Sequence, residues 1–483
     1  MKKYWKYVFI CRIIKKAVLL IVYPVIFICL TLMSCQESTE NQTPNVLIII
    51  ADDLGWSQIG CYGSNFYETP NIDKLSKSGI KFLNAYSAAS ICSPTRAAIM
   101  TGKYPARIDL TDFIPGNFPK NKPLLSPENW QKFLPLDEVT IGEKMEAYGY
   151  STGFFGKWHL SKEKLPPKSL SHNPSNQGFE ETFVTYKPSG KLIQKWQIKN
   201  KDFHNVDTIT KRGLKFIEQN KKGPFLLILS HNTIHDPLLE DQELIRKYRN
   251  KKGSEKKENN PKIGAMIETL DLSVGQIVKK LQKLKLFDNT LLIFCSDNGG
   301  KQKYALQKPF KKGKGWLYEG GIRVPLIISW PNKIKKSFVS EQMTSSIDFL
   351  PTILSVTNSG LNDKGIYDGI DISPLFSKEK KLINRDELYW HYPHYHIGSG
   401  MEPATAIRWK NYKLIQWHEA TILNQEKQIE LYNLKLDPGE ENDLSKIKPE
   451  IVILMRNKLK KWIKEVNAIM PKVNRDMLIE TKN

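Results

Sequence analysis

The sequence predicts an α/β protein, because three separated segments have the pattern of buried parallel strands. We expect these strands at residues 45–50, 225–230 and 290–295, each a continuous run of mainly apolar residues. Such runs are typical of parallel strands that helices cover on both faces. Polar residues follow each run directly, so they should gather at the carboxyl edge of the sheet, where ligands bind in open α/β folds.

Helices are expected between the strands, at residues 72–78, 141–148 and 264–284. The longest of them is amphipathic, since its apolar residues recur at spacings of three or four. By contrast, residues 240–262 are charged and rich in lysine. That composition predicts an excursion over the protein surface.

The pattern changes near residue 378. Four short strand-like runs follow, at residues 387–391, 405–409, 412–416 and 429–432, and turns separate them. They predict a small antiparallel sheet, and residues 448–466 should form a terminal helix. We therefore divide the body of the chain into a catalytic domain, residues 45–377, and a small α+β C-terminal subdomain, residues 378–483.

The N-terminus is typical of a secreted bacterial lipoprotein. In residues 1–34, the first 16 residues include six basic and no acidic ones, and the following 18 residues are uncharged. This pattern is typical of a signal peptide. The sequence Leu32-Met33-Ser34-Cys35 resembles a lipobox, which predicts lipidation of Cys35 and a polar tether over residues 35–44. The expected location is the periplasmic or cell-surface membrane. An uncleaved N-terminal anchor is the alternative.

Composition is typical of a globular protein and argues against a nucleic-acid-binding one. The 483 residues are 40% hydrophobic and 25% charged, as in globular proteins. The net charge is +22, but the lysines are scattered among acids and form no basic stripe with aromatic residues, so we expect no nucleic-acid partner. Two explanations of the charge stay open: lysine-rich codon usage, or attraction to a polyanion such as a sulfated polysaccharide.

Cysteine usage points away from a disulfide framework. The chain has six cysteines, of which two lie in the signal segment and Cys35 is the lipid site. An odd set remains, Cys61, Cys92 and Cys295, and its members are far apart. In an exported protein this predicts that at least one cysteine has another purpose.

Acidic pairs follow two of the predicted strands, Asp52-Asp53 after the first and Asp297-Asn298 after the third. Alone, either pair could be a solvated turn or a helix cap. Together they offer three carboxylates and one amide oxygen, a ligand set suited to Ca²⁺, or alternatively Mg²⁺, rather than Zn²⁺. A divalent cation would also offset the repulsion among buried acids.

The pentapeptide Cys92-Ser93-Pro94-Thr95-Arg96 has no second cysteine or histidine nearby, so it is neither a zinc nor a redox motif. It resembles the signature of type I sulfatases, in which this cysteine is oxidised to formylglycine (3-oxoalanine). Other segments resemble further blocks of that family. They are Gly156-Lys157-Trp158-His159, His235-Asp236-Pro237, and Lys314-Gly315 ahead of residues 318–325. The likeness runs from residue 45 to about 331 and fades toward the end.

The resemblance implies an alkaline-phosphatase-like fold: a large mixed sheet sandwiched by helices, with the small C-terminal subdomain beside it. It implies hydrolysis of sulfate monoesters on carbohydrates, and maturation of Cys92 by a formylglycine-generating enzyme. The implied metal ligands are Asp52, Asp53, residue 92, Asp297 and Asn298. The implied catalytic residues are Cys92, Arg96, Lys157, His159, His235 and Lys314.

Each implied catalytic residue has a role. Lys157, Lys314 and Arg96 supply positive charge, and Asp297 accepts a proton from the residue-92 hydrate as it attacks sulfur. His235, with Lys314, protonates the leaving oxygen. His159 then helps to release sulfate. His231 is a rival to His235, and Lys312 to Lys314; we prefer His235 and Lys314.

Substrate evidence comes from two segments. Residues 107–116 resemble a block of bacterial sulfatases acting on galactose- or N-acetylgalactosamine-type sugars, and Asp112 within it could bind a sugar hydroxyl or cap its loop. His394 and His396 could bind a sugar, or belong to an aromatic seam between domains. Two other functions stay open: a phosphomonoester or phosphonate hydrolase of the same superfamily, and a non-catalytic lipoprotein that binds sulfated glycans. No oligomeric state is predicted.

Overall fold

The computed structural model describes residues 43–161, 171–185, 202–359, 365–377 and 382–480. The predicted signal peptide, Cys35 and nearly all of the tether lie outside the described residues. The chain from Pro44 onward forms one compact unit. In the described part of the chain, no helix is long and apolar enough to cross a membrane.

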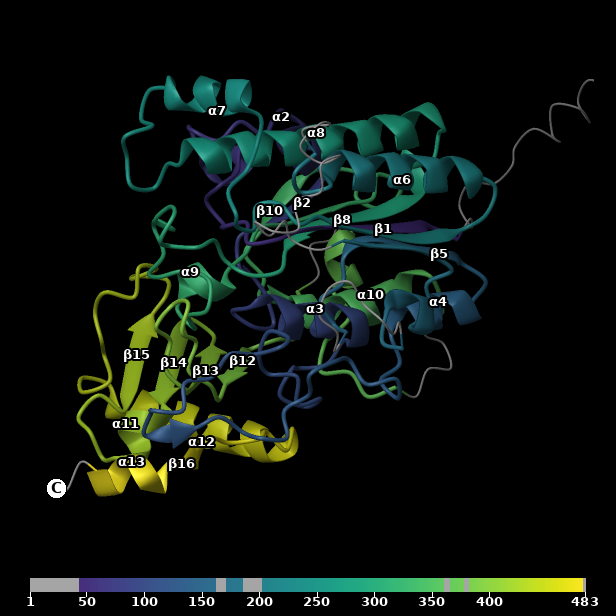
Figure 1. The fold of residues 1–483 in the computed structure, drawn as a ribbon. Helices are drawn as coiled ribbons and strands as arrows, with labels where there is room; N and C mark the ends of the chain where they lie inside the picture. Colours follow the sequence, from purple (N-terminus) through teal and green to yellow (C-terminus); the bar gives the residue numbers. More distant parts are fainter. Residues whose placement is uncertain (1–42, 162–170, 186–201, 360–364, 378–381, 481–483) are drawn as a thin grey trace, which may run out of the picture. The chain divides into compact units, whose positions relative to one another are not determined.

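The central element is an eight-stranded mixed sheet of order β10-β2-β9-β8-β1-β7-β5-β6, drawn in Figure 1. Its strands are β1 (Asn45–Ala51), β2 (Gly79–Phe82), β5 (Ser151–Lys157), β6 (Glu181–Thr185), β7 (Phe225–Ser230), β8 (Thr290–Ser296), β9 (Leu326–Ser329) and β10 (Phe338–Ser340). Strands β8, β1, β7, β5 and β6 run parallel, and β9 runs antiparallel to β8. The three predicted strands, and the predicted mixed sheet, are confirmed.

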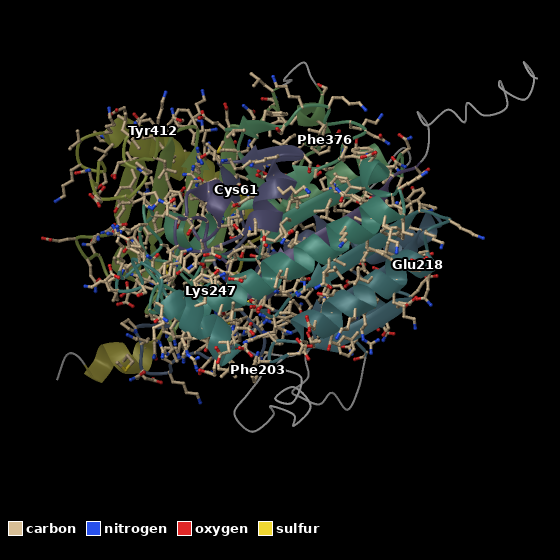
Figure 2. The ribbon with its side chains drawn as sticks, turned by 90° about the horizontal axis from the view of Figure 1, so that it is seen from above. Cys61, Phe203, Glu218, Lys247, Phe376 and Tyr412 are labelled. Atoms are coloured by element: carbon tan, nitrogen blue, oxygen red, sulfur yellow. The ribbon has the colours of Figure 1, made fainter. Side chains whose placement is uncertain are left out.

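Helices cover both faces of this sheet (Figure 1). Alternate residues of β1 point to opposite faces, so Val46 and Ile48 belong to one core cluster and Leu47 and Ile49 to the other. One face carries α2 (Pro70–Ser76), α6 (Val206–Gln219), α7 (Gln242–Arg249) and α8 (Pro261–Lys283); the other carries α3 (Cys92–Thr101), α4 (Ile141–Ala147) and α10 (Phe349–Val356). Figure 2 looks onto α6 and α8, which run side by side there.

Local signals set the helix boundaries. Asn260 caps α8 through its side chain, which accepts from the backbone N–H groups of Lys262 and Ile263, and Pro261 occupies the first turn. The expected surface excursion at 240–262 contains helix α7, which charge alone did not reveal. Its Ile245 and Tyr248 are one helical turn apart and both are buried.

The C-terminal part is an antiparallel sheet in sequence order, as predicted: β12 (Glu387–Tyr392), β13 (Ala404–Trp409), β14 (Tyr412–Trp417) and β15 (Ile429–Asn433). Helix α12 (Pro449–Glu465) covers one face, where the rings of Tyr389 and Trp462 stack at 4.8 Å. The other face packs against Ile91, Leu317 and Ile322 of the larger part.

Five 3-10 helices, Gly60–Tyr62, Pro174–Asn176, Phe287–Asn289, Ser346–Asp348 and Ser373–Phe376, and several minor strands and α-helices complete the described residues. The minor strands form the pairs β3 (Ala85–Tyr86) with β11 (Thr344–Ser345) and β4 (Leu124–Leu125) with β16 (Lys472–Val473). The short α-helices are α9 (Glu319–Ile322), α11 (His418–Ile422) and α13 (Arg475–Glu480). The one-turn helix α9 matters most for the site. It lies directly after the loop that carries Lys314 and touches the C-terminal sheet.

A buried ion cluster joins α9 to the C-terminal sheet. Lys413 Nζ of β14 lies 3.1 Å from Glu319 Oε1 and 2.8 Å from Glu440 Oε1, and all three side chains are fully buried. Glu440 Oε2 also accepts from the backbone N–H of Glu319 at 2.7 Å. Because these charges are desolvated, removing Lys413 leaves Glu440 without its cation, although Glu319 keeps an ion pair with Arg323 at 3.2 Å.

We therefore expect Lys413→Met to lower the free energy of unfolding by about 3–5 kcal/mol. The matched control is Lys460→Met on the exposed face of α12, which should change it by less than about 0.5 kcal/mol. Denaturant titration followed by tryptophan fluorescence measures both. Equal midpoints for the two variants would contradict the importance of the cluster.

Candidate active site

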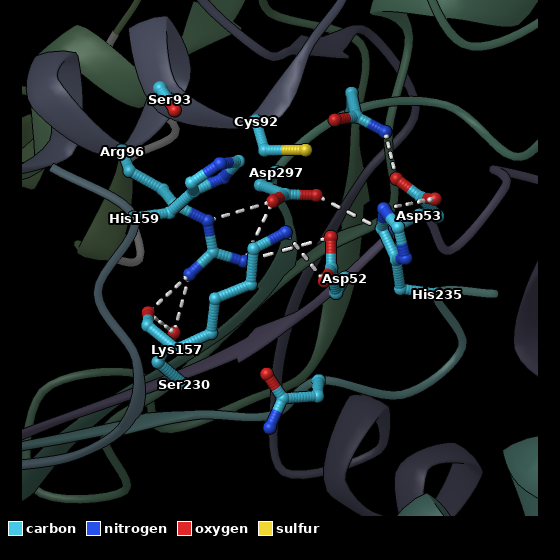
Figure 3. Close-up of polar contacts among 12 residues, drawn as sticks. Asp52, Asp53, Cys92, Ser93, Arg96, Lys157, His159, Ser230, His235 and Asp297 are labelled. Carbon is cyan, nitrogen blue, oxygen red and sulfur yellow. Dashed lines mark hydrogen bonds and ion pairs between the residues drawn. The ribbon is translucent and has the colours of Figure 1, made fainter. Parts of the chain in front are cut away.

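Four adjacent parallel strands deliver polar side chains to one edge of the sheet (Figure 3). Asp52 and Asp53 follow β1, Asp297 follows β8, Ser230 ends β7 and Lys157 ends β5. These strands are neighbours in the order β8-β1-β7-β5, so the side chains meet as the apolar runs predicted. Both aspartates after β1 and Asp297 are buried.

Cys92 is the first residue of α3, a helix in which all ten residues are buried. Its thiol is free, and Sγ accepts a hydrogen bond from Lys314 Nζ at 3.1 Å. Burial raises the pKa of this thiol above its ordinary value, although Lys157 and Lys314 oppose the shift. Unmodified Cys92 is therefore a poor nucleophile at neutral pH, because the thiolate is the reactive form.

Arg96 lies one turn further along α3 and points to the same side as Cys92. Its Nε and Nη2 donate to Asp297 Oδ2 at 2.9 and 2.7 Å. Its Nη1 donates to Ser230 Oγ at 2.5 Å and to the carbonyl of Lys157 at 2.7 Å. Arg96 thus ties together the ends of β8, β7 and β5. Ser230, the last residue of β7, was not singled out from the sequence.

Two lysines neutralise the aspartates after β1. Lys157 Nζ donates to Asp52 Oδ2 at 2.7 Å, and Lys314 Nζ donates to Asp53 Oδ1. Burial favours the neutral carboxyl, but Lys157 and the neighbouring cations outweigh it and hold the pKa of Asp52 well below its ordinary value. Burial would also lower the pKa of Lys314, yet Asp53 keeps it well above its ordinary value.

Glycine is required where β5 passes β7. Gly156 has a φ of 120°, and a Cβ there would lie 1.8 Å from the carbonyl oxygen of Ser230. This close approach brings Lys157 beside the end of β7. Strand β5 was not predicted from the sequence, because two glycines interrupt its apolar run.

The two predicted catalytic histidines lie at the same cavity. His235 Nε2 lies 3.8 Å from Asp53 Oδ2, and its Nδ1 bonds the carbonyl of Asp236 at 2.8 Å. Burial, reinforced by Lys314, lowers the pKa of His235 to about 3. His159 bonds the carbonyl of Ile114 through Nε2 at 2.8 Å and keeps a buried, unpartnered Nδ1. A carbonyl only accepts, so Nε2 carries the proton and Nδ1 is an acceptor.

The rivals of these residues lie elsewhere. His231 is fully buried, and its Nε2 contacts Ser273 Oγ of α8 at 3.2 Å, away from the cavity. Lys312 Nζ sits 4.3 Å from the ring centre of Trp316 and does not line the cavity. The geometry thus favours His235 over His231 and Lys314 over Lys312.

The site also contains a cluster that could hold a metal ion. One ligand atom each from Asp52, Asp53, Cys92 and His235 lies within 4.8 Å of the others. Three oxygens here are buried and accept no hydrogen bond: Asp52 Oδ1, Asp53 Oδ2 and Asn298 Oδ1. Orphaned buried acceptors are costly unless a cation or donor meets them. The residues present therefore fit a hard divalent cation.

Asp297 and Asn298 stand at the edge of that cluster. Asp297 Oδ1 accepts from the N–H of Asp53 at 3.2 Å, and Asn298 Nδ2 donates to Asp53 Oδ1 at 2.8 Å. The orientation of an amide is assigned from such bonds, and a bound cation would favour the flipped form with Oδ1 inward. Burial raises the pKa of Asp297 to about 6, against the opposing effect of Arg96.

A cavity of about 920 Å³ opens above this cluster, and Cys92, Lys157, His159, His235 and Lys314 all line it. Of the three predicted substrate-binding residues, only His396 lines the cavity. Asp112 is buried, and its Oδ1 accepts from the hydroxyl of Tyr392 at 3.0 Å. His394 is fully buried, and its Nε2 bonds Thr111 Oγ1 at 2.8 Å. The structure thus places Asp112 and His394 behind the cavity wall.

Several cavity residues were not found from the sequence. Lys301 forms an ion pair with Asp236 and lies 3.8 Å from Asp53 Oδ2. Lys303, Trp316 and Phe113 also line the cavity. Lys301 follows Asp297-Asn298 by three residues, so its position after a strand end was an available signal. No sequence pattern indicated that Trp316 and Phe113 would line the cavity.

A mixed sheet with an acid-rich cluster at its carboxyl edge, and a small antiparallel subdomain beside it, defines the alkaline-phosphatase-like class of hydrolases. Comparisons with known proteins name the family. The sulfatase family model matches residues 44–359, and the model of the N-sulphoglucosamine sulphohydrolase C-terminal region matches residues 310–468. The chain therefore belongs to the sulfatase family and is a sulfuric ester hydrolase.

The relatives have low sequence identity to this chain, but the similarity covers most of both proteins. A sulfatase of Formosa agariphila is 28% identical over 89% of this chain and 91% of its own length. The N-acetylgalactosamine-6-O-sulfatase of Bacteroides thetaiotaomicron is 26% identical over 86% and 92%. The crystal structure of Ps i-CgsB with k-i-k-neocarrahexaose has a TM-score of 0.71 at 29% identity, over 87% of this chain and 93% of that one.

Asp112 gives a pH-dependent prediction. Burial raises its pKa from 3.8 to about 8, so the folded protein binds a proton there that the unfolded chain releases. The raised pKa stabilises the folded protein below about pH 4, and this stabilisation is lost as the pH rises toward 8. Relative to Asp112→Asn, the wild type should lose up to about 1.4 kcal/mol of stability per pH unit across this window.

Denaturant titrations of both proteins at several pH values measure the difference. Other buried acids titrate equally in the two proteins and cancel in the comparison. A stability difference that does not change with pH would show that Asp112 is ionised in the folded protein.

Proposed function

We propose that this chain is a formylglycine-dependent carbohydrate sulfatase, acting on galactose- or N-acetylgalactosamine-type sulfated glycans. The observation that carries the proposal is the position of Cys92. Cys92 lines the cavity, and its Sγ accepts a hydrogen bond from Lys314 Nζ. The same Sγ belongs to the cluster that includes Asp52 and Asp53. The carbohydrate assignment is supported by the relative named for N-acetylgalactosamine sulfate and by the neighbour bound to an oligosaccharide.

In this proposal Cys92 Sγ stands in for an oxygen of the formylglycine hydrate, which would supply the nucleophile toward sulfur. Asp297 is suited to accept a proton, since burial raises its pKa to about 6, close to neutral pH. Arg96 fixes the Asp297 carboxylate by two hydrogen bonds. Lys157 and Lys314 both line the cavity beside residue 92 and would bind sulfate oxygens.

The remaining roles fall to the histidines. His235 and Lys314 both lie close to Asp53, and they would stabilise and protonate the leaving sugar oxygen. A bound sulfate adds negative charge, which raises the low pKa of His235. His159 presents an unprotonated Nδ1, which would take the second hydroxyl proton and release sulfate.

The cofactor and location belong to the same proposal. Held by Asp52, Asp53, Asp297, Asn298 and residue 92, a divalent cation would supply positive charge at the sulfate oxygens. Ca²⁺ suits this irregular oxygen set better than Mg²⁺, which demands octahedral geometry. Export as a lipoprotein anchored through Cys35, with maturation of Cys92 by a formylglycine-generating enzyme, would place the enzyme where polysaccharide is degraded.

Metal binding can be tested through stability. Ca²⁺ that binds only the folded protein raises its melting temperature, so we expect CaCl₂ to stabilise chelator-treated wild type. Asp53→Asn removes one charged ligand, so it should need at least about tenfold more Ca²⁺ than wild type for the same rise in melting temperature. The exposed Asp137→Asn is the control and should respond as wild type does. An equal response from Asp53→Asn would place the cation elsewhere.

Turnover tests the proposal directly. The matured protein should hydrolyse the sulfate ester of a sugar or a nitrophenol in preference to the matching phosphate ester. Cys92→Ala should lose essentially all turnover while keeping Ca²⁺-dependent stabilisation, because Asp52, Asp53, Asp297 and Asn298 remain. A preference for phosphate would favour a phosphoesterase. Full activity in Cys92→Ala would overturn the role of residue 92.

A further inference from the structure

The lysines that line the cavity differ in how their charges are balanced. Lys157 pairs with Asp52, Lys314 with Asp53, and Lys301 with Asp236. Lys303 also lines the cavity, is exposed, and makes no ion pair with any described residue. Among the described residues that line the cavity, Asp236 is the one carboxylate, and Lys301 already occupies it. Lys303 therefore presents an unneutralised charge to whatever fills the cavity.

The position of Lys303 relates it to the sulfate site. It lies two residues beyond Lys301, whose Nζ is 3.8 Å from Asp53 Oδ2. Two residues span at most about 7 Å of chain, so the backbones of Lys301 and Lys303 lie within that distance of each other, and both side chains line the cavity. Its Nζ rests 4.6 Å from the ring centre of Tyr304, a cation–π contact that favours one orientation of a long side chain.

Among the described residues, another part of the cavity wall consists of neutral aromatic side chains. Trp316 and His396 both line the cavity and are joined through Ser399, which accepts from Trp316 Nε1 at 3.1 Å and meets His396 Nδ1 at 2.9 Å. Phe113 packs edge-on against His396. Burial lowers the pKa of His396 to about 4, so it is neutral at pH 7 and contributes no charge. A sugar ring suits this wall, but an anionic group does not.

We propose that the substrate carries a second anionic group beside the sulfate to be removed, and that Lys303 binds it. The second group is a further sulfate ester or a carboxylate, on the same sugar or on the adjoining one. The inference rests on the proposed function and deepens it: the cavity selects a polyanionic sugar over one that bears a single sulfate. Lys303 acts here as a specificity-determining residue, with no part in the bond that breaks.

The experiment compares three galactose-containing disaccharides with the same scissile sulfate. One has no other charge, one has a second sulfate, and one has a carboxylate on the adjoining sugar; a nitrophenyl sulfate is the small reference substrate. The wild type should show a higher kcat/KM for at least one of the two doubly charged disaccharides than for the singly charged one. Lys303→Met should reduce that kcat/KM about three- to fivefold, as expected for an exposed ion pair, mainly through KM.

The variants make the result specific. Lys303→Met should leave the singly charged disaccharide and the nitrophenyl sulfate unchanged, which also shows that it folds. Lys303→Arg should keep the preference, and Lys308→Met, an exposed lysine on the same loop that does not line the cavity, should behave as wild type. Because the pair is exposed, added salt should shrink the difference.

Two outcomes separate this inference from the proposed function. If the matured wild type hydrolyses the singly charged sulfate but gains nothing from either second anion, the inference is wrong and the sulfatase assignment stands. The inference also fails if Lys303→Met slows all substrates equally. If the wild type hydrolyses no sulfate ester at all, the proposed function itself fails, and the inference falls with it.

Discussion

The site is organised around the repulsion among three buried carboxylates. Asp52, Asp53 and Asp297 follow two strands that are direct neighbours, so the fold cannot separate them. Buried like charges are costly unless cations stand close by. Arg96, Lys157 and Lys314 meet that need from α3, from the end of β5 and from the loop before α9. In the proposed function, the same cations would also balance the negative charge of a sulfate ester.

The C-terminal subdomain supports this arrangement from the side. Helix α9 follows the Lys314 loop and is held by Glu440 and Lys413. The N–H of Gly299, next to Asn298, donates to the carbonyl of Gly321 in α9 at 2.9 Å. Helix α9 therefore contacts the segment after Asp297-Asn298 and directly follows the loop that carries Lys314. His396 of the same subdomain reaches the cavity wall. The subdomain thus contributes to both the stability of the site and its shape.

Much of this arrangement follows from the sequence. Strands β1, β7 and β8 could be predicted because their apolar runs are unbroken, and their ends predict where the acids meet. Strand β5 could not, because Gly156 interrupts its pattern for a reason visible only in the fold, the approach of the Ser230 carbonyl. The pairing of Lys301 with Asp236 likewise depends on two loops meeting in space.

The histidines near residue 394 show a different limit. The sequence left two interpretations open, a sugar-binding cluster or an aromatic seam between domains. The chain leaves β12 at Tyr392 and turns, and His394 is buried while His396 lines the cavity. Strand periodicity no longer applies beyond that point, and alternation could not tell the two apart. The lipoprotein signal and Cys35 fall outside the described residues and stay predictions.

The chemical state of residue 92 tests the proposed formylglycine-dependent function most directly. Peptide mass spectrometry across Cys92–Arg96, on protein purified from cells that contain a formylglycine-generating enzyme, can be combined with a hydrazide probe for aldehydes. We predict an aldehyde at residue 92 that reacts with the probe, in proportion to sulfatase activity. A preparation that is fully active yet holds only the unmodified thiol would contradict this prediction.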